Sequence, residues 1–163
     1  MFLPKSEFSK VIINSPLIAI DLCIVKDKKL LLGKRVNPPA KNFYFVPGGR
    51  IRKSEKIKDA FIRILKNELG FELKQNNHKF IKELGIYEHF YDDNFLDNKE
   101  FTTHYIVIAY LVPYESLIKK IKNVTNPQHS DYIWVDTNSE KNYSINIHNY
   151  VLDYLKNHHF KKL

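Results

Sequence analysis

The sequence predicts an α/β (α+β) protein in which a mixed β-sheet is sandwiched between helices. The first observation is that strand-like and helix-like segments follow one another along the chain, with hairpin-like pairs of strands among them. The second is the length of 163 residues, which suits one domain spanning residues 1–163. The third is composition, because 44% hydrophobic and 27% charged residues are typical of a globular chain.

Apolar runs rich in Leu, Ile and Val predict the strands. Leu17–Val25 and Lys29–Arg35 flank a short polar segment and predict a β-hairpin. Phe43–Val46 reads as a short strand that enters a turn at Pro47-Gly48-Gly49. Three further strands are predicted, at Phe80–Tyr91, Phe101–Val112 and Tyr132–Val135.

Apolar residues at helical spacing predict the helices. Ser54–Leu69 is the clearest of them, with Ser54 as the N-cap, Glu55 in the first turn and Gly70 as the stop at the carboxyl end. Two further helices are predicted, at Pro4–Asn14 and Ile145–His158.

The formal net charge of +8 favours anionic partners, although a solvated lysine-rich surface explains the same number. A single cysteine, Cys23, excludes an internal disulfide framework and a multi-cysteine zinc site. No apolar segment approaches the length that a bilayer requires. We therefore expect a cytoplasmic protein with no membrane partner.

Two carboxylates interrupt apolar patterns. Glu68 shares a helical stripe with Phe61 and Leu65, where a buried carboxylate needs a partner or a metal ion. Alternatively, Glu68 lies at the edge of the stripe and reaches water. Asp21 interrupts the apolar run Leu17–Val25 and must have a partner if both faces of that strand are covered. A strand with one wet face is the alternative.

A histidine near the last predicted strand is a candidate for proton transfer. His129 is predicted to lie in a loop just before Tyr132–Val135. Its ordinary pKa lies near neutrality, so it can act as a general base, although most loop histidines are simply solvated.

The segment from Gly49 to Phe71 resembles the Nudix box, G-x5-E-x7-R-E-U-x-E-E-x-G-U, where U is a bulky apolar residue. Ile64 and Asn67 stand where the family usually has glutamates, which help bind the cations that drive water attack at phosphorus. Glu68 is then the one ligand carboxylate that the box retains. The matching positions are Gly49, Glu55, Arg63, Leu65, Glu68, Gly70 and Phe71.

The wider chain is similar to the GDP-mannose mannosyl hydrolase branch of this family, which lacks the same glutamates. The resemblance weakens after about residue 136. It implies magnesium-dependent hydrolysis of GDP-mannose, with GDP-glucose as a second candidate, to GDP and free sugar. Water would attack the anomeric carbon with inversion. The similar stretches are residues 1–3, 15–17, 31–35, 45–50, 89–95, 101–105 and 128–129.

The resemblance also implies a ligand set and a general base. A magnesium ion would be held by Glu68, Gln128 and the backbone carbonyl of Gly48. These are all oxygen ligands, which suit magnesium or manganese. His129 would take a proton from the attacking water.

Further roles follow from the same resemblance. Arg35 and Arg50 would contact the leaving diphosphate, because guanidinium groups fit phosphate oxygens and stay charged. Asp21 would lie near the sugar, and Tyr105 would donate a hydrogen bond to the diphosphate or the sugar. The family is dimeric, so we expect a homodimer. An N-terminal segment would contact the substrate, where aromatic groups can sandwich guanine, through Phe2, Leu3 and Phe8.

Two other functions fit parts of the sequence. An ordinary Nudix pyrophosphohydrolase would yield GMP and a sugar 1-phosphate, but the residues at Ile64 and Asn67 argue against it. A non-enzymatic nucleotide- or RNA-binding module is compatible with the charge of +8. The simultaneous presence of Arg35, Glu68 and His129 argues against that module, and we expect no nucleic-acid partner.

Overall fold

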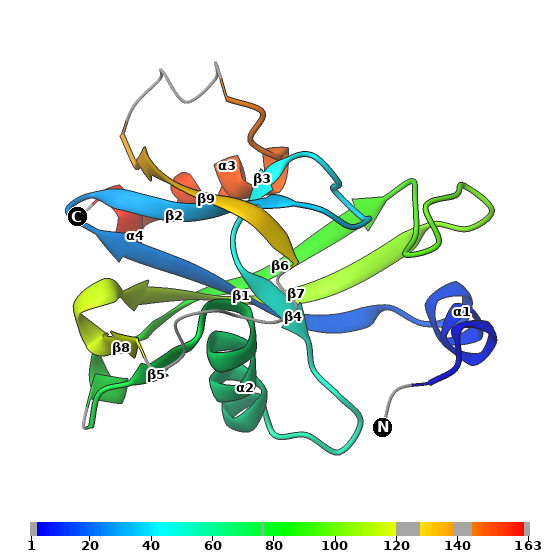
Figure 1. Ribbon diagram of the computed structural model, residues 1–163, viewed down its shortest axis with the longest axis horizontal. Helices are drawn as coiled ribbons and strands as arrows, with labels where there is room; N and C mark the ends of the chain where they lie inside the picture. The colour runs from blue at the N-terminus through cyan, green and yellow to red at the C-terminus, as the bar shows by residue number, and fades with distance from the viewer. Residues whose placement is uncertain (1–2, 76, 120–127, 139–144, 162–163) are drawn as a thin grey trace.

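A mixed sheet separates helix α2 from helices α3 and α4, as Figure 1 shows. The computed structural model describes residues 3–75, 77–119, 128–138 and 145–161. This arrangement confirms the predicted fold class. Within the described residues, no helix is long and apolar enough to cross a lipid bilayer.

The main sheet contains strands β1 (Leu17–Lys26), β2 (Lys29–Arg35), β3 (Tyr44–Phe45), β4 (Gly48–Arg50), β6 (Lys82–Tyr91), β7 (Thr103–Pro113) and β9 (His129–Asp136). A small second sheet pairs β5 (Phe71–Leu73) with β8 (Leu117–Lys119). The α-helices are α1 (Lys5–Asn14), α2 (Ile57–Leu69), α3 (Asn149–Leu155) and α4 (His158–Lys161). Two 3₁₀ helices are η1 (Asn77–Phe80) and η2 (Tyr114–Ser116).

Strand β1 changes partner along one of its edges. It pairs with β7 in parallel along Leu17–Val25. On the other edge it pairs antiparallel with β4 at Ala19–Asp21 and with β2 at Val25–Lys26. The sheet therefore divides at this edge, with β4 on one branch and β2, β3 and β9 on the other.

Both faces of β1 are covered, which explains its nearly continuous apolar sequence. Residues of one parity, such as Leu22, pack in the core that includes Ile64 and Leu65 of α2. Residues of the other parity, such as Cys23, pack in the core that includes Val151 of α3. Asp21 shares the parity of Cys23 and therefore faces α3.

The start of α2 differs from the prediction. The helix begins at Ile57, with Lys56 rather than Ser54 at the N-cap position. Ser54 has a φ of 62° and belongs to the turn before the helix, as does Glu55. The predicted stop at Gly70 is confirmed, because Gly70 adopts a φ of 68° and its N–H reaches the last carbonyls of the helix.

Other boundaries also differ from the prediction. The predicted turn at Pro47-Gly48-Gly49 contains the start of β4, because Gly48 and Gly49 pair with β1. His129 is the first residue of β9, not a loop residue, because it pairs opposite Arg35. The 3₁₀ helix η1 occupies the predicted start of the strand at Phe80. The helix predicted over Ile145–His158 begins only at Asn149 and ends at Leu155, and Ile147 instead forms an isolated bridge with Tyr44. A second helix begins at His158, where the Asn157 side chain accepts from the His159 N–H.

Candidate active site

A chain of polar contacts joins Glu68 of α2 to Arg35 of β2 through Gln128. The Gln128 Nε2 donates to Glu68 Oε1 at 3.1 Å, and the Gln128 Oε1 accepts from Arg35 Nη1 at 3.3 Å. Arg35 is held from its other side, because its Nε donates to the Pro39 carbonyl at 2.8 Å. The Tyr132 hydroxyl donates to the Glu68 carbonyl at 3.2 Å. Three predicted site residues are therefore directly connected.

Glu68 carries a buried oxygen atom without a partner. Its Oε2 accepts no hydrogen bond from any residue that the structure describes. Burial raises the pKa of Glu68, and hydrogen bonds from Gln128 oppose that rise. A buried carboxylate oxygen with no donor costs free energy. A cation at Oε2 would compensate for this cost.

The other oxygen atoms that could bind a metal ion here fit magnesium. Pro47 and Ile51 each form a backbone hydrogen bond with β1. Hydrogen-bonded positions alternate along an antiparallel pair of strands, so the Gly48 carbonyl points away from β1. No three His, Cys, Asp or Glu side chains among the described residues are placed to hold a metal. An ion here would therefore depend on one carboxylate, Glu68, with amide and carbonyl oxygens. Such an oxygen set suits magnesium or manganese rather than zinc.

His129 is enclosed in the protein, with 1% of its surface exposed. Gly33 of β2 makes room for it, because a Cβ atom at Gly33 would lie 2.5 Å from the His129 Cγ. Neither ring nitrogen has a partner within the described part of the chain. Burial, and secondly the charge of Arg35, lower the pKa of His129 to about 3. The ring is therefore neutral near pH 7, and the same burial weakens it as a proton acceptor.

Asp21 is buried, and the structure supplies the partner that its burial requires. The Tyr154 hydroxyl donates to Asp21 Oδ2 at 2.6 Å. Burial raises the pKa of Asp21 to about 7, against the hydrogen bond from Tyr154 and the charge of Arg35. Gly48 lies against the other oxygen, since a Cβ atom there would clash with Asp21 Oδ1. Asp21 thus adjoins Gly48.

The second arginine is held by an aromatic residue of α1. The Arg50 guanidinium carbon lies 3.9 Å from the centre of the Phe8 ring, which also packs against Phe95 with ring centroids 4.8 Å apart. Burial raises the pKa of Tyr105, and the positive charges of Arg50 and Arg35 both oppose this rise. Both arginines therefore lie within electrostatic reach of Tyr105.

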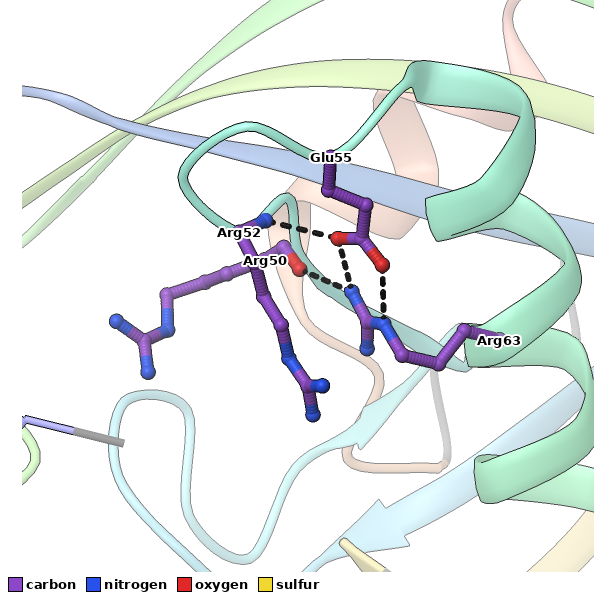
Figure 2. A network of polar contacts seen from close by, with 4 residues as sticks. All are labelled: Arg50, Arg52, Glu55 and Arg63. Carbon is purple, nitrogen blue, oxygen red and sulfur yellow. Dashed lines mark hydrogen bonds and ion pairs between the residues drawn. The ribbon is translucent and has the colours of Figure 1, made fainter. Parts of the chain in front are cut away.

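An ion pair fixes the loop that precedes α2. Figure 2 shows Arg63 facing Glu55, with its Nε at 2.6 Å from Oε1 and its Nη2 at 2.7 Å from Oε2. Arg63 also donates to the Arg50 carbonyl at 2.9 Å. The Arg50 side chain extends away from the ion pair in the same view. The Glu55–Arg63 pair therefore orders the backbone that carries Arg50.

Two predicted contacts lie at the N-terminus. Phe2 lies outside the described residues. Leu3 is 50% exposed just ahead of α1. Substrate contact by either residue stays a prediction.

Sequence reasoning missed the partners of the predicted residues. Tyr154 lies in the predicted helix Ile145–His158, where no neighbouring residue marks its hydroxyl as a donor, and the stacking of Phe8 on Arg50 had no local signal. The need of buried Asp21 for a donor was the one clue to Tyr154, but 133 positions separate the two. The role of Tyr132 as a donor to Glu68 was also missed.

The chain matches the family model for the NUDIX domain over residues 16–153. It is 36% identical over 110 residues to the low-salt glycan biosynthesis protein Agl8 of Haloferax volcanii, covering 68% of this chain and 67% of that protein. It is 42% identical over 55 residues to an ADP-ribose pyrophosphatase of Methanocaldococcus jannaschii, and this match spans 34% of this chain and 32% of that protein.

The fold is also similar to solved structures. The crystal structure of a MutT NUDIX hydrolase from Burkholderia pseudomallei superposes with a TM-score of 0.67 at 20% identity, covering 88% of this chain and 98% of that one. This likeness concerns the fold. The match of the family model over most of the chain assigns the family, and the loop–helix–loop around α2 is where its box lies. The chain belongs to the Nudix hydrolase family.

Proposed function

We propose that this Nudix hydrolase cleaves a GDP-sugar into GDP and free sugar, with GDP-mannose as the first candidate and GDP-glucose as the second. Water attacks the anomeric carbon, and the configuration of the sugar inverts. The reaction breaks a glycosyl bond and leaves the diphosphate intact.

The observation that carries the proposal is the chemistry of two box positions. Ile64 is 1% exposed and belongs to the apolar core under the sheet, and Asn67 is exposed on α2. Neither supplies a carboxylate beside Glu68. Attack at phosphorus in the ordinary manner of the family uses those carboxylates to hold cations. Attack at carbon needs only that the departing diphosphate and the sugar cation be stabilised.

The chain's own residues supply that stabilisation. Arg35 and Arg50 bind the diphosphate, where a positioned donor is commonly worth about 3 kcal/mol. Neutral His129 takes the proton from the attacking water. Asp21 binds sugar hydroxyls and stabilises the positive charge that develops on the sugar ring. Tyr105, which lies within electrostatic reach of both arginines, donates a hydrogen bond to the diphosphate or the sugar.

Magnesium would be held by Glu68, Gln128 and the Gly48 carbonyl. When bound, it would supply positive charge to the leaving diphosphate. Nudix hydrolases generally use divalent metal ions, which supports this part of the proposal. In the structure the Gln128 nitrogen faces Glu68 and its oxygen faces Arg35. Ligation by Gln128 beside Glu68 therefore requires the amide to turn over, after which Arg35 needs another acceptor. A diphosphate oxygen is such an acceptor.

The relatives support a nucleotide-linked substrate. The Haloferax volcanii protein is named for glycan biosynthesis, which fits a sugar donor. The Methanocaldococcus jannaschii protein is named an ADP-ribose pyrophosphatase, which makes cleavage between the phosphates the second candidate function. The second candidate is weaker because Ile64 and Asn67 replace the carboxylates that this cleavage uses.

Hydrolysis in ¹⁸O-labelled water separates the two reactions. The protein is incubated with GDP-mannose and magnesium, and the products are separated by mass. We expect the label in free mannose, with the opposite anomer formed first. Label in GMP or mannose 1-phosphate would reject attack at carbon. Parallel reactions with GDP-glucose and ADP-ribose, compared by kcat/KM, identify the preferred substrate.

Assembly and location are part of the same proposal. A homodimer is expected from the family resemblance, and sedimentation equilibrium measures it directly. A cytoplasmic location and the absence of a nucleic-acid partner stay predictions, for which fractionation and nucleic-acid retention assays are the tests.

A further inference from the structure

Helix α3 brings a phenol hydroxyl to the carboxylate of Asp21. Tyr154 is fully buried, and its hydroxyl donates to Asp21 Oδ2 at 2.6 Å. This distance is typical of a charge-assisted O–H···O bond. The resemblance to known enzymes is weak in this part of the chain, so it implied no role for Tyr154.

A histidine completes the arrangement around the hydroxyl. His89 Nε2 lies 3.2 Å from the Tyr154 oxygen. The hydroxyl has one proton and gives it to Asp21, so His89 must be the donor, with its own proton on Nε2. Burial lowers the pKa of His89 to about 4, and the neutral ring meets this requirement. His89, Tyr154 and Asp21 thus form a directed chain of two hydrogen bonds.

The position of α3 is fixed by contacts at both of its ends. At one end the Tyr150 hydroxyl accepts from the Phe90 N–H and donates to the Phe90 carbonyl, each at 2.7 Å. The Tyr150 ring stacks on His89 with centroids 4.0 Å apart. At the other end the Tyr154 ring packs edge-on against Tyr87 at 4.7 Å. The hydroxyl of Tyr154 therefore has little freedom to move.

The two oxygens of Asp21 have different surroundings. Oδ2 is bound by Tyr154, and Oδ1 lies beside Gly48, the glycine whose carbonyl is a proposed magnesium ligand. One oxygen is thus anchored in the protein, and the other borders the proposed site.

We propose that Tyr154 is a positioning residue, which holds Asp21 by Oδ2 so that Oδ1 faces the sugar of the substrate. This inference rests on the proposed function, because it uses the assignment of Asp21 to the sugar. Tyr154 itself does not touch substrate. Its hydroxyl fixes the orientation of a carboxylate that would otherwise be free to rotate in a buried space.

The first test is Tyr154→Phe, which removes the hydroxyl and keeps the packing of the ring. With GDP-mannose and magnesium we expect kcat to fall about tenfold or more, since a hydrogen bond to a charged group is lost. We expect KM to change by less than about twofold, because the bond matters most when the sugar carries positive charge. An unchanged kcat would overturn the proposal.

The matched control is Tyr150→Phe, which removes a phenol hydroxyl from the same helix. That hydroxyl bonds to the backbone of Phe90, not to Asp21. We expect its kcat to stay within about twofold of the parent value, because the ring at position 150 still stacks on His89 and Tyr154 still packs on Tyr87, which keep α3 in place. An equal loss of kcat in Tyr150→Phe and Tyr154→Phe would show that α3 matters only for stability, and would overturn the proposal.

A double-mutant cycle tests whether Tyr154 acts through Asp21. In an Asp21→Asn background, we expect Tyr154→Phe to lower kcat by less than about twofold, because the carboxylate is already gone. The full tenfold loss in that background would overturn the proposal. The position of the ¹⁸O label reports which bond breaks. The double-mutant cycle reports the coupling between Tyr154 and Asp21, whichever bond that is. A failure of the proposed function is therefore distinguishable from a failure of this inference.

Discussion

The α2 side and the α3 side of the candidate site differ in how far apart their interacting residues lie in the sequence. On the α2 side, Glu55, Arg63 and Glu68 occupy the Nudix box within 14 positions, and Glu55 pairs with Arg63 as a local contact. On the α3 side, Asp21 depends on Tyr154, which lies 133 positions away. A motif records the first kind of arrangement, because spacing along a helix fixes geometry. The second kind arises only when the sheet and α3 pack together.

The largest effect is expected at His129, the proposed general base. His129→Gln should lower kcat by about 10²- to 10⁴-fold, because the proton acceptor is lost. KM should change little, since His129 is not assigned to substrate binding. Steady-state kinetics with GDP-mannose measures both constants. Parental turnover in this variant would remove His129 from the mechanism.

The box positions that lack carboxylates should differ sharply in their tolerance of one. Ile64→Glu should reduce the free energy of unfolding by about 3 kcal/mol or more, because it places a charge in the apolar core under the sheet. Asn67→Glu is the matched variant, and it should change stability by less than about 0.5 kcal/mol because Asn67 is exposed. Urea unfolding measures both values. Equal effects at the two positions would contradict the packing of α2.

The one box carboxylate beside the proposed metal should control the response to magnesium. Glu68→Gln should raise the magnesium concentration needed for half-maximal activity by about 100-fold, because the charged ligand is removed. Glu72→Gln, which alters an exposed partner of Lys66, is the control and should leave the metal response unchanged. Magnesium titration of activity distinguishes them. An unaltered response in Glu68→Gln would exclude Glu68 as a ligand.

The ion pair before α2 should have the smallest effect and a defined pH dependence. Hydrogen bonds from Arg63 lower the pKa of Glu55 from 4.5 to about 2. Because the folded pKa is depressed, the stabilisation is present above the unfolded pKa and disappears as pH falls through the folded value. Glu55→Gln should therefore lower Tm by a few degrees at pH 7, with the difference from the parent protein vanishing near pH 2. Thermal melts across this pH range measure the difference, and a pH-independent difference would reject the ion pair as its cause.

The sequence predicted those parts of the molecule that depend on local periodicity. Gly70 stops α2 as expected, since only its own φ and the preceding carbonyls decide the result. Ser54 failed as an N-cap because its φ of 62° places it in the turn before the helix, which begins at Ile57. The preference of a single residue for the N-cap position was thus overridden by the loop in which Glu55 pairs with Arg63, eight positions away. No propensity scale contains that contact.

The candidate site followed the same division. Glu68 and Asp21 were found because a carboxylate in an apolar pattern needs a partner. Gln128 was expected beside Glu68 only from the family resemblance. Tyr154 could not be predicted, since it comes from a distant segment and carries no motif of its own. His129 was predicted to lie in a loop. Its burial in a strand could not be foreseen, because it depends on Gly33, whose missing side chain leaves the space for the ring.

The division of the sheet at β1 has a consequence for how a bound nucleotide would affect the protein. Arg35 and His129 belong to the β2–β9 branch, and Gly48 and Arg50 belong to β4. Between the branches, β1 is the strand that pairs with both β2 and β4. A ligand that binds both arginines would add a second connection between the branches. Hydrogen exchange should then slow in β2 and β4 together when GDP and magnesium are added, although the two strands are not neighbours in the sheet.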